Sequence, residues 1–145
     1  GCSNGMAFTA DRTKFFWTCS TRKQIYQYDY DEATGDIANG LLWYQADADE
    51  GITDGLTIDL DDNIWSARWD GYRVRKHAAA DGHVLEEIKL PVAKVSSVIF
   101  GGPEFDTMYL TTAGGDGKES LDGAIYTVQV PGVKGRPEFR SKLTG

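Results

Sequence analysis

Two polar residues, Asn4 and Asp54, are the part of this sequence best suited to chemistry. Each is followed by glycine and then by a stretch with alternating apolar positions, Met6-Ala7-Phe8 after the first and Leu56-Thr57-Ile58 after the second. Amide and carboxylate oxygens are hard donors that suit calcium, magnesium or manganese, or a zinc ion that retains water ligands. If the fold brings these two side chains together, they form part of a site for a divalent cation.

The same two dipeptides have a plainer interpretation. Asn-Gly and Asp-Gly are common in turns, and each one taken singly favours a turn over a functional site. However, they occupy matching positions in two similar segments, and each precedes an alternating stretch typical of a strand. This repetition favours the functional interpretation.

A third segment, Ser96-Ser97-Val98-Ile99-Phe100, follows the same pattern. The three segments begin at positions 4, 54 and 96, and a period of about 40 to 50 residues with several short strands is typical of a β-propeller. The sequence therefore predicts an all-β domain over 1–145, with blades at about 4–50, 54–92 and 96–145. The innermost strand of each blade would line a central channel and bring Asn4 and Asp54 together.

Aromatic residues mark the predicted second strands. Trp17, Trp65 and Tyr109 stand at what look like matching places, which predicts packing between blades because aromatic side chains bury large areas. Ala124 to Val130 is expected to form a strand, and Glu138 to Ser141 a last one. Three blades alone leave two faces open. A missing amino-terminal half or a second copy of the chain, as a homodimer, would cover them.

Composition restricts the classes of function. The chain has 145 residues and a formal net charge of −7, which argues against binding nucleic acid or an anionic membrane through bulk charge. Two cysteines do not make a disulfide-rich scaffold. No apolar run approaches the roughly 20 residues that span a bilayer. We therefore expect a cytoplasmic protein.

The remaining titratable residues suggest no second site. His77 and His83 are expected at the surface or in hairpins. The acidic run Asp47, Asp49 and Glu50 is expected to be a solvated loop, with a wall of the channel mouth as the alternative.

Motifs along nearly the whole chain resemble the carboxy-terminal half of the regucalcin/gluconolactonase family, which includes senescence-marker-protein and luciferin-regenerating-enzyme-like members. The matching runs are Cys2 to Phe8, Thr53 to Asp59, Asn63 to Ala67, Gln27 to Asp31, Ala33 to Gly35, Gly71 to Val74, Lys89 to Val92, Ser96 to Gly102 and Met108 to Ala113.

The resemblance implies half of a six-bladed propeller, with one divalent cation (Ca, Zn, Mg or Mn) in the channel. Asn4 and Asp54 match two of the family's protein ligands, and the third is a glutamate in the family's amino-terminal half. The implied reaction is metal-dependent hydrolysis of a sugar lactone, in which the cation polarises the ring carbonyl and Asp54 also accepts a proton. The alternatives are a non-catalytic metal- or ligand-binding propeller fragment and a purely structural piece.

Overall fold

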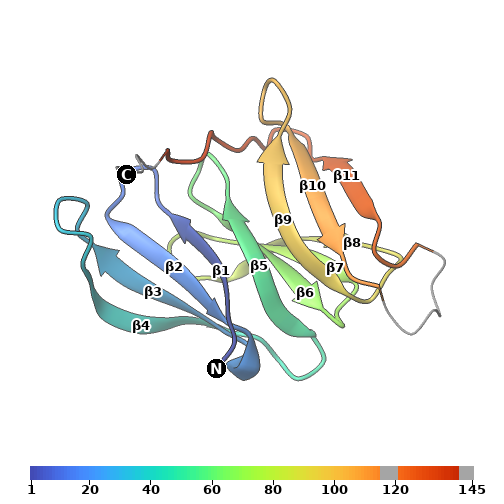
Figure 1. Cartoon of the computed structure of the whole chain (residues 1–145), viewed down its shortest axis with the longest axis horizontal. Helices are drawn as coiled ribbons and strands as arrows, with labels where there is room; N and C mark the ends of the chain where they lie inside the picture. Colours follow the sequence, from blue (N-terminus) through green and yellow to red (C-terminus); the bar gives the residue numbers. More distant parts are fainter. Residues whose placement is uncertain (115–120, 141–145) are drawn as a thin grey trace, which may run out of the picture.

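The computed structural model describes residues 1–114 and 121–140, whose strands form three antiparallel sheets placed side by side (Figure 1). We call these sheets blades 1, 2 and 3. Blade 1 contains β1 (Ser3–Phe8), β2 (Lys14–Cys19), β3 (Gln24–Tyr30) and β4 (Ile37–Gln45); blade 2 contains β5 (Ile52–Ile58), β6 (Ile64–Trp69), β7 (Arg73–His77) and β8 (Val84–Lys89); blade 3 contains β9 (Val95–Gly101), β10 (Thr107–Thr112) and β11 (Ile125–Gln129). A short 3₁₀ turn, η1 (Ser20–Arg22), follows β2, and the described residues contain no α-helix.

The first strand of each blade is the innermost one. The strands β1, β5 and β9 run side by side in the same direction at the front of Figure 1, and the later strands of each blade extend outward and backward. Segments that are far apart in the sequence therefore meet along one axis, as the repeat predicted.

The hydrophobic core lies between blades. Phe16, Ile25 and Trp43 of blade 1 pack against Leu56 and Ile64 of blade 2. A second cluster joins the other side of blade 2 to blade 3, and its largest members are Trp65, Val74, Phe100, Met108 and Leu110. Since successive residues of a strand point to opposite faces, each blade has one face toward the preceding blade and one toward the following blade.

Strand register identifies equivalent positions in the three blades. Met6, Leu56 and Val98 are equivalent, and their exposed fractions are 61%, 7% and 2%. Blade 1 thus exposes the face toward a preceding blade that blades 2 and 3 bury. On the opposite face, Thr57 is 6% exposed but its equivalent Ile99 is 46% exposed, because no blade packs on this face of blade 3 among the described residues.

The predicted equivalence of Trp17, Trp65 and Tyr109 is wrong by one residue. Trp17 pairs with Met6 on the outward face of blade 1, whereas Phe16 is the equivalent of Trp65 and Tyr109. A shift of one residue moves a side chain to the other face of a sheet. Phe16 and Trp65 pack between blades as expected of this position, and Trp17 stacks on Tyr26 instead.

The C-terminal segment 131–140 crosses all three blades at the far ends of the inner strands. The backbone N–H of Gly135 donates to the Phe105 carbonyl of blade 3. The Arg136 guanidinium donates to the Phe8 carbonyl of blade 1 at 2.8 Å and to the Asp59 carbonyl of blade 2 at 3.2 Å. Residues 138–140 form no strand, so the strand predicted at Glu138 to Ser141 is wrong in its described part, and residue 141 lies outside the described residues.

The described part of blade 3 accordingly has three strands, whereas four were predicted. Among the described residues, we find no helix with the length and hydropathy required to cross a membrane.

Candidate metal centre

Asn4 and Asp54 lie side by side at the beginning of the inner strands. Asn4 lies close enough to Asp54 for its amide to lower the pKa of the Asp54 carboxyl, and the backbone N–H of Gly55 acts in the same direction. Both residues stand inside strands, β1 and β5, so the alternative interpretation as turn dipeptides is wrong. The juxtaposition that the repeat predicted is therefore present.

A β-bulge holds each of these residues. The pairing of β1 with β2 shifts between Ser3 and Met6, and the pairing of β5 with β6 shifts between Thr53 and Leu56. A bulge bends the strand and redirects its side chains. The same irregularity at the same place in two blades interrupts the regular ladder at Asn4 and at Asp54.

The glycines after Asn4 and Asp54 allow the inner strands to approach each other closely. A Cβ on Gly5 would lie 2.2 Å from the backbone nitrogen of Leu56. A Cβ on Gly55 would lie 2.4 Å from the Ser97 hydroxyl and 2.7 Å from the Ser96 carbonyl. No other side chain fits there without displacing a strand, so the two glycines set the spacing of the site.

Ser20 ties the two ligand-bearing strands together. Its backbone N–H donates to the Cys2 carbonyl, just before β1, at 3.0 Å. Its hydroxyl donates to the Thr53 carbonyl, next to Asp54, at 2.7 Å. One buried serine in η1 thus fixes the start of β1 relative to β5. The sequence analysis missed this residue, and only its place directly after β2 could have drawn attention to it.

The electrostatic environment of Asp54 suits a cation. Its side chain is only 9% exposed, and burial raises the pKa of its carboxyl above the usual value although the hydrogen bonds from Asn4 and Gly55 act in the opposite direction. Desolvation of a carboxylate without enough compensating donors destabilises the ionised form. A divalent cation would supply the missing stabilisation.

The donor set matches an oxygen-seeking ion such as calcium, magnesium or manganese better than zinc in a closed nitrogen and sulfur site. Rotation of the Asn4 amide by half a turn would exchange its nitrogen for its oxygen and present two oxygens instead of a hydrogen-bonded pair. The fit is incomplete, because the described residues contain no cluster of three or more His, Cys, Asp or Glu side chains that could hold a metal.

The remaining residues near the predicted site have other roles. Ser96, the equivalent of Asn4 and Asp54 in blade 3, shares a hydrogen bond of 2.9 Å with the Thr111 hydroxyl in its own blade. Asp47 and Asp49 are exposed, as a solvated loop would be, but Glu50 is buried.

Glu50 belongs to a polar network between blades 1 and 2 that the sequence analysis did not predict. It forms ion pairs with Arg68 and Arg75 and accepts a hydrogen bond from the Tyr44 hydroxyl. With these partners, its carboxylate is occupied and is not the third ligand of a cation site.

His77 lies in the same network, at the hairpin between β7 and β8, which was one of the two expected positions, but it is not at the surface. It is fully buried, and desolvation with the nearby Arg68 charge lowers its pKa to about 3, so the ring is neutral at pH 7. Its Nδ1–H donates to the Gly82 carbonyl at 2.8 Å, which leaves Nε2 to accept from Arg68 at 2.9 Å. His83 is exposed, as expected.

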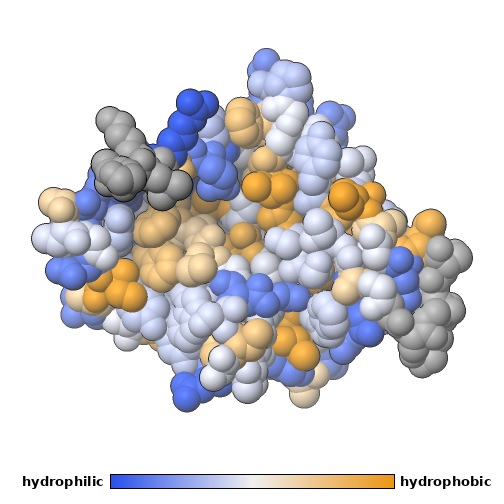
Figure 2. Space-filling view, viewed as in Figure 1, coloured by the Kyte–Doolittle hydropathy of each residue, from blue (hydrophilic) through white to orange (hydrophobic). Residues whose placement is uncertain are grey.

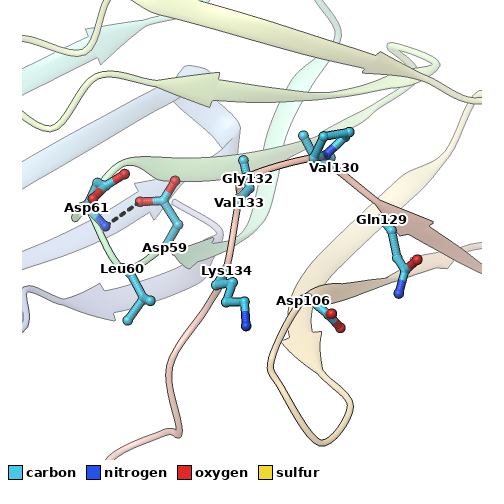
Figure 3. A pocket seen from close by; sticks show the side chains of 10 residues that line it. Asp59, Leu60, Asp61, Asp106, Gln129, Val130, Gly132, Val133 and Lys134 are labelled. Carbon is cyan, nitrogen blue, oxygen red and sulfur yellow. Dashed lines mark hydrogen bonds between the residues drawn. The ribbon is translucent and has the colours of Figure 1, made fainter.

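A cleft of about 570 Å³ lies at the opposite end of β5 (Figure 3). Asp59, Leu60 and Asp61 line one side, Asp106 and Gln129 the other, and the segment that carries Lys134 runs between them. Asp59 is about 17 Å from Asp54 along an extended strand, so this cleft is separate from the pair of candidate ligands.

Comparison with known proteins places the chain in a family. Residues 1–114 match the SMP-30/gluconolactonase/LRE-like region, and the chain belongs to this family. A pentonolactonase, XacC, from Haloferax volcanii is 42% identical over 99% of this chain and 52% of its own length. Regucalcin from Gallus gallus is 35% identical over 94% of this chain and 48% of its own length. The chain thus spans about half the length of the curated relatives it matches.

The solved structures agree. A luciferin-regenerating enzyme superposes with a TM-score of 0.90 at 33% identity, over 99% of this chain and 50% of that one. A calcium-binding protein, regucalcin, from Agrobacterium tumefaciens gives a TM-score of 0.85 at 23% identity, which supports the fold alone. The three blades are therefore half of a six-bladed β-propeller, as predicted.

Proposed function

We propose that this chain is the cation-binding half of a sugar-lactone hydrolase and that Asn4 and Asp54 are two of the protein ligands of its divalent cation. The pairing of a buried, poorly compensated carboxylate with an amide carries the proposal. Membership of a family that contains a pentonolactonase supports the substrate class.

Asp54 and Asn4 would have different roles in the proposed reaction. Asp54 would hold the cation and accept a proton from the attacking water, and Asn4 would bind without reducing the positive charge of the ion. The bound cation would supply Lewis-acid polarisation of the lactone carbonyl. A carboxylate beside a cation is a weak base, so holding the ion is the main role of Asp54.

In the proposed reaction, the water oxygen adds to the ring carbonyl carbon and the bond from that carbon to the ring oxygen breaks. The ring oxygen takes up a proton, and the open-chain sugar acid ionises and releases one to solution. A pH indicator can therefore follow turnover of gluconolactone or of a pentonolactone.

The test is calorimetric titration of the chain with calcium, magnesium, manganese and zinc, followed by the lactonase assay with and without the ion that binds. We expect binding, its loss in Asp54→Asn, and a rate stimulated by the ion. Absence of binding for all four ions would overturn the metal site.

The second candidate is a non-catalytic metal- or ligand-binding module. It is favoured by the incomplete ligand set among the described residues and by the length of the chain, which is about half that of its relatives. Binding of a cation without a stimulated rate on either lactone would select this candidate.

A further inference from the structure

The outermost strand of blade 1, β4, contains a bulge at Asn39 and Gly40. The pairing of β3 with β4 shifts between Gln27 and Asp29. Tyr28 of β3 therefore stands opposite two residues of β4 instead of one, and the extra residue is left out of the regular ladder. Within the described sheet β4 pairs only with β3, so the bulge lies at a sheet edge.

The geometry of the bulge accounts for both of its residues. Asn39 has a φ of 50°, in the left-handed region that asparagine adopts more readily than most residues with a side chain. A Cβ on Gly40 would lie 2.4 Å from Cε1 of the Tyr28 ring, so no larger residue fits there unless the ring moves. The fold thus requires an Asn-Gly step at this place, together with the chemistry of that pair.

The exposure of this step follows from its place on an outermost strand. Leu41 and Leu42 point to opposite faces of the sheet, yet they are 48% and 50% exposed. Leu85, on the outermost strand of blade 2, is 49% exposed although that blade has a neighbour on each side. Figure 2 shows hydrophobic side chains at the surface at the left, over the region of β3 and β4. Asn39 is exposed in the same way, so water reaches its amide.

We propose that Asn39 is a site of spontaneous deamidation. The backbone nitrogen of Gly40 adds to Cγ of Asn39 and loses its proton, while the bond from Cγ to Nδ2 breaks and Nδ2 leaves as ammonia. Because Gly40 has no side chain, its nitrogen is open to this attack. Water then opens the five-membered succinimide at either carbonyl carbon and gives aspartate or isoaspartate. The reaction consumes one water, releases one ammonia and needs no oxidant or reductant.

The chain contains a second Asn-Gly step, Asn4-Gly5, which provides an internal comparison. This step lies on the innermost strand β1, where a Cβ on Gly5 would lie 2.2 Å from the backbone nitrogen of Leu56. Closure of the succinimide requires Cγ of Asn4 to turn back onto the Gly5 nitrogen. We expect this movement to require separation of β1 from β5, whereas the bulge in β4 reacts without such an opening.

Deamidation changes the local charge of blade 1. The Asn39 amide donates to the Asp29 carboxylate at 2.7 Å, and Asp29 also forms an ion pair with Lys14. An aspartate at position 39 loses this hydrogen bond and brings a second negative charge next to Asp29, which is unfavourable across a strand pair. An isoaspartate also lengthens the main chain of β4 by one carbon. Both products weaken the pairing of β4 with β3.

Peptide mapping by mass spectrometry tests the proposal on the folded chain after incubation in mildly alkaline buffer. It measures the replacement of an amide nitrogen by oxygen at each asparagine. We expect Asn39 to react at least ~10-fold faster than Asn4, which corresponds to an opening free energy of about 1.4 kcal/mol for β1. In guanidinium chloride the fold is lost, and the two steps should react at similar rates.

Asn39→Gly is the matched control, because glycine accepts the positive φ and has no amide. The mass change in this peptide should disappear in the variant; a change that persists would belong to another amide and would overturn the assignment. Equal rates at the two steps in the folded chain, or a faster reaction at Asn4, would also overturn it. Isomerisation at an Asp-Gly step exchanges no net mass, so the measurement is specific for the amide.

The effect on blade 1 is measured with Asn39→Asp, which reproduces the aspartate product. Its urea midpoint should lie below that of Asn39→Gly, since both variants lose the hydrogen bond to Asp29 but only the first adds a charge. Equal midpoints would overturn the predicted repulsion. Neither variant should change the calorimetric affinity for calcium, because Asn39 lies on the outermost strand and the proposed ligands lie on the innermost strands.

Discussion

Asp54 and Asp59 lie near opposite ends of β5, and these two buried carboxylates differ in their hydrogen-bond partners. Asp54 is 9% exposed and Asp59 is 2% exposed. Asp54 has two donors, Asn4 and the Gly55 amide, and burial raises its pKa. The two oxygens of Asp59 receive the indole N–H of Trp65 at 3.0 Å, the backbone amides of the turn, the Asn63 side chain and the Lys76 ammonium.

The difference distinguishes a carboxylate with a structural role, Asp59, from Asp54, which we propose as a ligand of the cation. The donors around Asp59 fill its hydrogen-bonding capacity, and its work is to hold the turn between β5 and β6. Asp54 retains capacity in a place where water is largely excluded, which is costly unless something else binds there. Asp54 and Asp59 are close in sequence and similarly buried, so neither property distinguishes their roles. The number of hydrogen-bond donors around each carboxylate does.

The largest expected effect is on cation binding. Asp54→Asn removes the only charged ligand in the described pair, and we expect the affinity for calcium to fall more than ~100-fold, beyond the range known for residues that merely support ligands. Asp59→Asn should change it by no more than a few-fold. Calorimetric titration of both variants measures this, and equal losses would remove the distinction between the two carboxylates.

Stability should respond in the reverse order. Asp59→Asn replaces one carboxylate oxygen with an amide nitrogen. If the remaining oxygen keeps the two turn amides, the Lys76 ammonium and the Trp65 indole N–H lose their acceptor, so we expect a loss of about 2–3 kcal/mol in the free energy of unfolding. Asp54→Asn removes a desolvated charge and should make the metal-free chain more stable. Urea unfolding without calcium checks both; a destabilised Asp54→Asn would show that its carboxylate is already satisfied.

The repeat and the positions of Asn4 and Asp54 could be predicted because alternation and a polar-glycine step recur in the sequence. The register of the second strands could not. Phe8 pairs with Phe15 and Ile58 with Ile64, and the turns between these strands differ in length by one residue. Sequence similarity alone therefore predicts the wrong face for Trp17.

The partners of Glu50 and His77 could not be predicted from the sequence either. Their contacts join blade 1 to blade 2, and no local pattern specifies a contact between blades. Glu50 differs from the exposed Asp47 and Asp49 in being buried and ion-paired. The burial of one residue in a run of three acidic residues could not be inferred from the sequence.

The spacing of the two ligand strands offers a third test. Gly55→Ala places a Cβ against the Ser96 carbonyl and the Ser97 hydroxyl, and we expect a destabilisation of about 2 kcal/mol together with weaker calcium binding, since the strands must move apart. Gly114→Ala is the matched control, because no atom of the described residues lies within 4 Å of its added Cβ. It should stay within about 0.5 kcal/mol of the wild type. Unfolding by urea and calorimetry with calcium measure both effects; a Gly55→Ala chain like the control would contradict the close approach.

Ser20 is expected to act as a positioning residue with a smaller effect. Ser20→Ala removes the hydrogen bond to the Thr53 carbonyl, worth about 1 kcal/mol, and should lower the affinity for calcium several-fold. Ser20→Thr retains the hydroxyl and should restore binding.

Thr18→Val is the control for Ser20, because its buried hydroxyl has no hydrogen-bond partner among the described residues. This variant can alter stability but should leave the calcium affinity unchanged. Equal effects of Ser20→Ala and Thr18→Val on calorimetric affinity would assign Ser20 a purely structural role.

The smallest expected effect is the pH dependence of the free-energy cost of burying the ionised Asp54 carboxylate. The folded-state pKa of Asp54 lies above its ordinary value of 3.8, so between these two values the folded chain binds more protons than the unfolded one. Stability contributed by this group is therefore present at low pH and is lost as pH rises through the folded-state pKa. The stability advantage of Asp54→Asn over the wild type should be near zero below pH 3.8 and should grow with rising pH to a plateau. Carboxyls with lowered pKa, such as Asp29 and Glu87, contribute equally to both chains and cancel in this difference. Saturating calcium should reverse its sign, because the ion binds the ionised carboxylate; a difference that is independent of pH would mean that Asp54 carries no desolvation penalty.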